Sequence, residues 1–149
     1  MATIRSRRCA WLLQASLWSA GGCGGEPPAP RFTEPRVLGG QSVDASVLNR
    51  GAEVYRVRCA TCHGPEGAGD GPGARGMRNP PTDFRAGRFR LSAPDGGLPS
   101  DEVLDSVIRE GRVEQGMPPW PGLLPEDRNA VVQFLKTFSD RWSAREAES

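Results

Sequence analysis

The feature that most constrains this chain is the run Cys59-Ala60-Thr61-Cys62-His63. Two cysteines separated by two residues and followed by a histidine form the attachment pattern of a c-type haem. The thiols bond to two vinyl groups on one macrocycle, and the intervening residues set the thiols at the matching separation. The next residue then directs its imidazole at the iron. We predict one covalent haem c, anchored by Cys59 and Cys62, with His63, the single histidine of the chain, as axial ligand.

Three other interpretations of this run remain open on sequence alone. A structural zinc ion uses four ligands, and this part of the chain offers only Cys59, Cys62 and His63. A thioredoxin-like dithiol expects a βαβ context, which the sequence does not indicate. The third is a chance occurrence in an unrelated helical protein. An export signal would favour haem, because bacteria attach covalent haem outside the cytoplasm.

Residues 1–22 have the organisation of such a signal. Three arginines precede a moderately apolar stretch over residues 9–20, which ends in small residues and is short for a membrane-spanning helix. Ala20-Gly21-Gly22-Cys23 resembles the cleavage box of bacterial lipoproteins, so we predict acylation of Cys23. Plain cleavage and a disordered basic N-terminus are the alternatives. The predicted location is the periplasm or the outer side of a bacterial membrane, with a lipid anchor on the membrane surface.

Composition divides the rest of the chain. Residues 23–43 are rich in proline and glycine and show no helical or strand period, so we predict a tether. Residues 44–142 are predicted to form one domain, and residues 143–149 a polar tail. Because Cys9 and Cys23 fall in or beside the leader, no disulfide framework is expected. Lysine and arginine do not cluster, which argues against a nucleic-acid partner.

The domain is predicted to be all-α, with three main helices and long loops. The first covers about residues 44–59, with Val47, Gly51, Val54 and Tyr55 on its inner face. The second covers residues 101–110, capped by Ser100 and stopped by Gly111. The third covers about residues 125–139, beginning at a proline. The predicted inner stripes of the last two helices are Val103, Leu104, Val107 and Ile108, and Val131, Phe134, Leu135 and Phe138.

The second axial ligand has two candidates. Met77 follows His63 closely, inside a glycine- and proline-rich stretch. Met117 lies in Gly116-Met117-Pro118-Pro119, where the prolines stiffen the backbone and the glycine lets it turn. Such a loop can hold a thioether over the opposite face of the ring, so we favour Met117. Its alternative role is a buried packing residue. Ligation by histidine and methionine closes the iron and raises its reduction potential, which favours an electron carrier over a catalyst.

At this point the chain resembles the monohaem class I cytochromes c over about residues 44–140. Gly51-x-x-x-Tyr55, the CATCH run and Gly116-Met117-Pro118 occur in the family's order. The resemblance implies a cytochrome c-like fold wrapped around one haem, with Met117 as distal ligand. It also implies close crossing of the terminal helices at Gly51, with Tyr55, Phe134 and Phe138 at the junction. A proline near Pro80 or Pro81 is expected to accept a hydrogen bond from the Nδ1–H of His63.

These observations predict an electron-transfer protein that cycles between Fe(II) and Fe(III) and exchanges electrons with redox partner proteins. Trp120 and Phe84 are expected either in the haem pocket or in the core elsewhere. One alternative is a relay subunit of a larger membrane oxidoreductase complex. Another is a haem sensor or enzyme with an open iron position.

Overall fold

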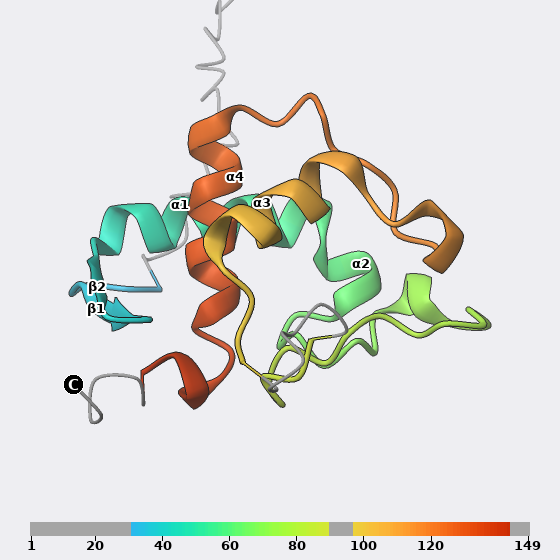
Figure 1. Ribbon diagram of the computed structural model, residues 1–149, viewed down its shortest axis with the longest axis horizontal. Coiled ribbons are helices and arrows are strands. Elements are labelled where there is room, and N and C mark those ends of the chain that lie inside the picture. Colours follow the sequence, from blue (N-terminus) through green and yellow to red (C-terminus); the bar gives the residue numbers. More distant parts are fainter. Residues whose placement is uncertain (1–30, 90–96, 144–149) are drawn as a thin grey trace, which may run out of the picture.

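The fold is organised by the crossing of α1 (Ala45–Arg58) and α4 (Pro125–Lys136) (Figure 1). The computed structural model describes residues 31–89 and 97–143. At the crossing, a Cβ added to Gly51 would overlap the carbonyl oxygen of Ala130 and lie 2.7 Å from Cβ of Phe134. Only a residue without a side chain allows the two helices this close. The buried face of α1 consists of Leu48, Gly51 and Tyr55, whereas the predicted Val47 and Val54 are only partly buried.

Helix α3 (Asp101–Glu110) packs against α4 and has the predicted bounds. The Ser100 hydroxyl accepts a hydrogen bond from the Val103 N–H at 3.4 Å, and Gly111 ends the helix at φ +71°. Its buried residues are Leu104 and Ile108. The prediction that Val103 faces inward is wrong, since its side chain is 38% exposed.

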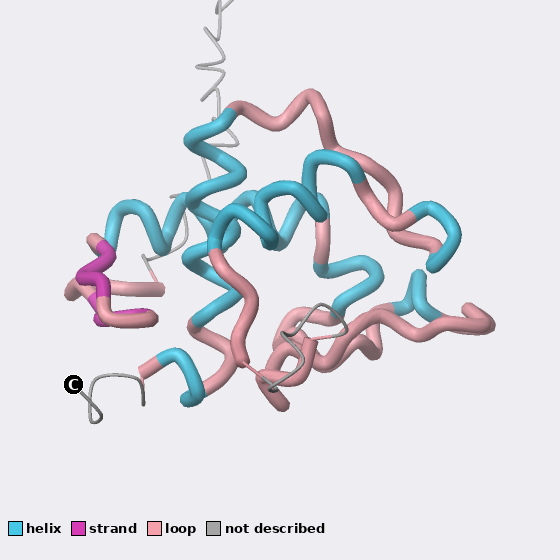
Figure 2. Tube along the Cα trace, viewed as in Figure 1, coloured by secondary structure: helices cyan, strands magenta, loops and turns pink. Residues whose placement is uncertain are grey.

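The remaining helical elements are short. Helix α2 (Ala60–His63) follows α1 almost directly, and single 3-10 turns cover η1 (Pro72–Ala74), η2 (Val113–Gln115) and η3 (Asp140–Trp142). Helix α4 ends at Lys136, before the predicted end at residue 139, because Ser139 instead caps η3 by accepting from the Arg141 N–H. Helices and long loops make up nearly all of the described chain (Figure 2). The prediction of an all-α fold is confirmed.

A small β-hairpin precedes α1 and was not predicted. Strands β1 (Arg36–Leu38) and β2 (Gln41–Val43) pair antiparallel, with Arg36 opposite Val43. The turn between them is Gly39-Gly40, both with positive φ, as two-residue hairpin turns require. The residues that the sequence analysis assigned to a tether therefore carry structure from at least residue 31 onwards.

The same segment is fastened to the domain. Phe32, Leu38 and Val43 are buried in the common core. The Phe32 N–H donates to Oδ1 of Asn49 at 2.9 Å, and the Asn49 amide donates to the Phe32 carbonyl at 2.8 Å. The prediction of a free tether is wrong over residues 31–43, because these apolar side chains gain more from burial than the proline- and glycine-rich composition suggests.

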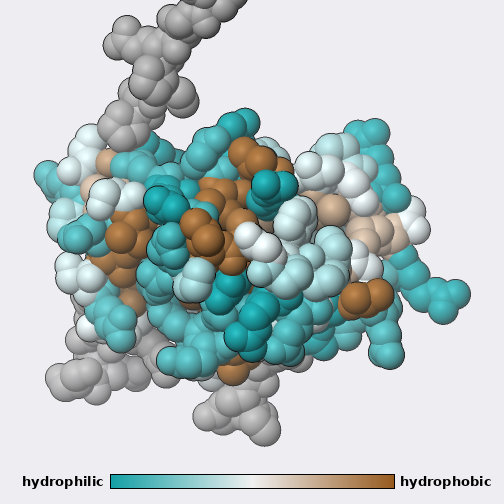
Figure 3. Space-filling model, turned by 90° about the horizontal axis from the view of Figure 1, so that it is seen from above, coloured by the Kyte–Doolittle hydropathy of each residue, from teal (hydrophilic) through white to brown (hydrophobic). Residues whose placement is uncertain are grey.

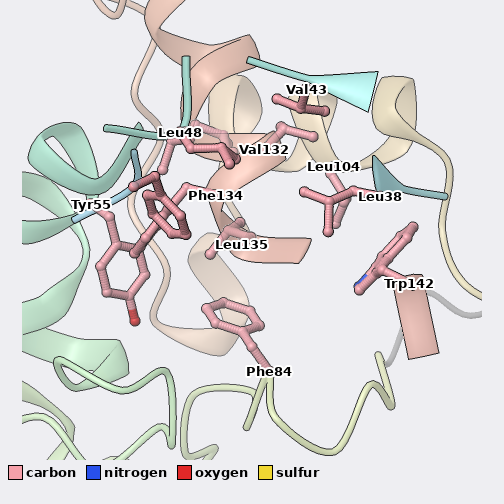
Figure 4. Packing of buried hydrophobic residues seen from close by; sticks show 13 residues of the cluster. Leu38, Val43, Leu48, Tyr55, Phe84, Leu104, Val132, Phe134, Leu135 and Trp142 are labelled. Carbon is pink, nitrogen blue, oxygen red and sulfur yellow. The ribbon is translucent and has the colours of Figure 1, made fainter. Parts of the chain in front are cut away.

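The core lies between α1, α3, α4 and the hairpin. Phe134 is nearly central, with Tyr55 beside it and Trp142, Leu38 and Leu104 toward the other end (Figure 4). The ring centroids of Tyr55 and Phe134 are 5.4 Å apart. Phe84 enters the cluster from the long loop, so the loop that follows the CATCH run is held by packing (Figure 4).

The surface is mixed. On the face seen in Figure 3, apolar groups lie among mostly hydrophilic residues. Among the described residues, the most exposed large apolar residue is Val113, at 71%. Among residues 31–89 and 97–143, no helix has the length and apolar character needed to cross a bilayer. The predicted export signal, Cys23 and most of the polar tail lie outside the described residues.

Candidate functional site

The CATCH run forms a tight turn at the end of α1. Cys59 is both the last cap of α1 and the first cap of α2, and its carbonyl accepts from the His63 N–H at 2.9 Å. Gly64 ends α2 at φ +76°. The Tyr55 hydroxyl donates to the Gly64 carbonyl at 2.7 Å, which ties the turn back onto α1. The local fold thus fixes both thiols and the imidazole on one short segment.

This segment forms one wall of a cavity of about 350 Å³. Cys59, Cys62 and His63 line one part of it, and the loop that contains Met117 lines another. A smaller cavity of about 80 Å³ shares His63 and Met117 and extends toward the core. Its other residues are mainly apolar and come from the long loop, α3 and α4: Phe84, Phe89, Leu104, Val107, Ile108 and Leu135.

Met117 is held by its backbone. The Arg112 N–H donates to the Met117 carbonyl at 2.8 Å, and the Met117 N–H donates back to the Arg112 carbonyl at 3.1 Å. Gly111 and Gly116 flank this small loop at φ +71° and +88°, which favours glycine at both positions. The Trp120 N–H then bonds to the Ile108 carbonyl at 3.0 Å and returns the chain to α3.

Met77 lies at the same cavity but in a different position. It lines the larger cavity and is absent from the lining of the inner one. Its Cε rests against Gly116, where it would overlap an added Cβ. Met117, by contrast, packs against the core and lines both cavities. Both thioethers therefore approach the site, and Met117 is the one that reaches its interior.

The His63 ring is stacked on Phe84, with centroids 4.6 Å apart. Its Nδ1 is buried and has no hydrogen-bond partner in the described structure. Burial lowers the pKa of His63, and the backbone of Thr82 opposes this shift. The imidazole is therefore neutral near pH 7, as a ligand nitrogen must be.

Pro80 and Pro81 lie where the sequence analysis expected them, in the lining of the larger cavity. However, neither carbonyl accepts a hydrogen bond from His63 Nδ1. The Pro81 carbonyl oxygen lies close to Gly69, 2.5 Å from the position of an added Cβ. The expected hydrogen bond is thus not formed in this structure.

The other predicted residues surround the site. Gly51 lies at the α1–α4 crossing, and the Tyr55 ring packs against Phe134 and Phe138, at 5.4 and 5.2 Å between centroids. Phe84 is buried against His63, and Trp120 lines the larger cavity. The Arg58 guanidinium lies 5.5 Å from the Trp120 ring centroid and covers this edge.

Arg112 is a cavity residue that sequence reasoning missed. It lines both the larger and the inner cavity. No periodicity singles it out, since it lies in a loop beyond α3. The only available signal was the pair Gly111 and Gly116, which closes a turn and brings position 112 next to Met117.

The residues present fit a covalent haem. Two half-buried thiols on one turn can anchor it, and burial, followed by the neighbouring Cys62, raises the pKa of Cys59 to about 12, so this thiol is neutral before attachment. His63 lines the same cavity as both thiols, and its buried Nδ1 has no hydrogen-bond partner among the described residues. The inner wall is mainly apolar, which suits a flat hydrophobic macrocycle. Within the described residues, no group of three or more His, Cys, Asp and Glu side chains is arranged to hold a metal ion directly.

A small helical fold with these groups around an apolar cavity defines a monohaem c-type cytochrome domain. Residues 46–135 match the family described as cytochrome c oxidase, cbb3-type, subunit III, and the chain belongs to this family of haem-binding domains. The predicted cofactor, one covalent haem c, is thereby confirmed, and it serves electron transfer.

Among solved structures, the chain is similar to a chain of the reducing HAO-like protein complex Kustc0457/Kustc0458 of Kuenenia stuttgartiensis. The sequence identity is 40% and the TM-score 0.61. The match covers 64% of this chain and 44% of that chain, so it spans less than half of the larger protein. No protein of curated function matches this chain by sequence.

Proposed function

We propose that this protein is a one-electron carrier whose haem iron is closed by His63 and Met117. The observation that supports this most is the paired backbone bonding of Arg112 and Met117, which holds the thioether at the inner cavity that His63 also lines. When bound, the haem supplies the Fe(II)/Fe(III) couple. A closed iron undergoes little rearrangement on electron transfer and has no free position for a substrate.

The chain's own residues then have defined tasks. Cys59 and Cys62 fix the cofactor, and His63 presents a neutral nitrogen. Phe84 and the apolar side chains of α3 and α4 exclude water from the inner wall. Electrons would enter and leave at the edge near the CATCH run, where Cys59 and Cys62 are only half-buried.

The test is an absorption spectrum of the haem-loaded protein, with and without carbon monoxide, for wild type, Met117→Ala and the matched control Met77→Ala. We expect wild type and Met77→Ala to show the ferric sulfur–iron band and to resist carbon monoxide. Met117→Ala should lose the band and bind carbon monoxide in the reduced state.

The other outcomes separate the alternatives. If Met77→Ala alone loses the band, Met77 is the ligand. If wild type lacks the band and binds carbon monoxide readily, the iron is open, and a sensor or enzyme replaces the carrier.

A second candidate function is a relay subunit of a larger oxidoreductase. It is supported by the similar chain of Kuenenia stuttgartiensis, whose printed description is that of a protein complex. In this case the electron passes from a catalytic partner through the haem of this chain. Purification of the protein from its native membrane under mild detergent tests this: a stable stoichiometric partner supports the relay, and a monomer supports the free carrier.

We further propose export to the periplasm or the outer side of the membrane, with acylation of Cys23. The support is the sequence pattern of residues 1–23 and the need to attach haem outside the cytoplasm. Residue 31 already belongs to the described domain, so only residues 24–30 would separate a lipid on Cys23 from it in sequence. Mass spectrometry of the mature N-terminal peptide, with Cys23→Ala as control, tests it: an unmodified peptide would contradict acylation.

A further inference from the structure

The haem cavity has an uneven charge lining. Two arginines, Arg58 and Arg112, are among the residues that line its larger part, and Arg112 is the one arginine among the described residues that line the inner part. No aspartate or glutamate is among the residues that line either cavity in the described chain. Arg112 is half-buried against this mainly apolar lining, and a nearby anion would offset the cost of partly removing its charge from water.

The protein itself does not provide that anion. Within residues 31–89 and 97–143, the Arg112 side chain forms neither an ion pair nor a hydrogen bond, although carboxylates are close in sequence. Glu110, two residues before it, pairs with Arg109 at 2.8 Å. Glu114, two residues after it, forms no ion pair with it. Other arginines of the domain do find carboxylates, such as Arg128 with Asp105 at 2.8 Å.

The second guanidinium has a different environment. Arg58 directly precedes Cys59 and lies over the Trp120 ring, so it belongs to the edge at which the cofactor is attached. A haem has its two propionate carboxylates on the side of the macrocycle opposite to its two vinyl-derived attachment points. Arg112 is among the residues that line the inner cavity. Neither cysteine lines that cavity, and Arg58 does not line it either. Arg112 is therefore the better placed of the two for a carboxylate on the far side.

We propose that Arg112 pairs with a haem propionate and thereby raises the reduction potential of the iron. Guanidinium and carboxylate form strong charge-assisted hydrogen bonds. The positive charge compensates the propionate, and an uncompensated propionate would stabilise the ferric state. Because Arg112 and Met117 exchange backbone hydrogen bonds, one short loop holds both the propionate and the axial thioether.

The test is the midpoint potential of the haem-loaded protein for wild type, Arg112→Gln, Arg112→Lys and Arg109→Gln. Arg109→Gln is the matched control, since it removes the same charge from a half-exposed position that does not line the cavity. We expect Arg112→Gln to lower the ratio of reduced to oxidised haem, measured at one fixed solution potential, by roughly tenfold. This corresponds to a midpoint potential lower by about 59 mV for a one-electron couple. Arg112→Lys and Arg109→Gln should stay within about twofold of wild type.

The sulfur–iron band separates this effect from loss of the axial ligand, because the bonds that hold Met117 come from the backbone of residue 112. The proposal is overturned if Arg112→Gln keeps the band and matches Arg109→Gln in potential. If Arg112→Gln does not retain haem, Arg112→Lys decides. A midpoint potential of Arg112→Lys close to that of wild type supports charge compensation. A tenfold lower reduced-to-oxidised ratio in Arg112→Lys refutes it.

Discussion

Replacing Gly51 by alanine tests the helix crossing on which the site rests. The new methyl group would overlap the Ala130 carbonyl and approach Cβ of Phe134, so α1 and α4 must separate. Overpacking a well-packed core costs about 1–3 kcal/mol. We expect a cost at the upper end of this range, because the Ala130 carbonyl is a backbone group and cannot move aside by changing rotamer. Alanine regains up to about 1 kcal/mol over glycine inside a helix, which leaves a loss of about 2 kcal/mol.

The assay is guanidinium unfolding of the haem-loaded protein, followed by circular dichroism. A loss of about 2 kcal/mol lowers the folded-to-unfolded ratio roughly 30-fold. Gly122→Ala is the control, since nothing lies within 4 Å of its added Cβ and its φ is not in the left-handed region. We expect that variant to match or slightly exceed wild type. If Gly51→Ala is as stable as Gly122→Ala, the two helices do not touch at this residue and the reasoning is refuted.

The remaining predictions concern three fixed side chains. Tyr55→Phe loses its buried hydrogen bond, so we expect about 1 kcal/mol less stability near neutral pH. Burial raises the pKa of Tyr55, so near pH 10 the phenol ionises in the unfolded chain but not in the folded one. The wild-type protein should therefore lose its stability advantage over Tyr55→Phe as the pH rises above about 10. If the unfolding free energies of the two proteins depend equally on pH, this prediction is contradicted. Asn49→Ala removes both hydrogen bonds to Phe32, so we expect the free energy of unfolding to fall by about 1–2 kcal/mol and proteolysis before α1 to become faster. An unchanged rate of cleavage would show that these bonds do not hold the segment. Lys136 is 3% exposed and forms an ion pair with Asp101, so an amine-reactive reagent should modify it only after unfolding. Peptide mass spectrometry measures this, and labelling of Lys136 in the native protein would contradict the burial of the ion pair.

The parts of the fold that could be predicted are those with a local signal. The CATCH run specifies its cofactor by covalent chemistry, and the bounds of α3 follow from Ser100 and Gly111. The apolar stripe of α4 was visible because Val131, Phe134 and Leu135 recur at helical spacing and are buried. In each case the information lies within about one helical turn.

The parts that were missed depend on distant contacts. The sequence around Phe32 does not indicate that its backbone forms two hydrogen bonds with the side chain of Asn49. Residues 31–43 were therefore predicted from composition to be part of a tether. The hairpin strands are only three residues long each, too short for a clear alternation. Arg112 acquires its position only when Gly111 and Gly116 close the loop. Long-range closure, unlike helix formation, leaves little trace in a single sequence.

The crossing of α1 by α4 also bears on how the protein is made. A chain is synthesised from its N-terminus, so α1 and the cysteines that follow it exist before α4 does. During that interval, the Gly51 face of α1 has no partner, and Cys59 and Cys62 are held only by contacts with their near neighbours. In the folded domain both thiols are half-buried, so haem attachment before α4 packs would meet them more exposed than attachment afterwards.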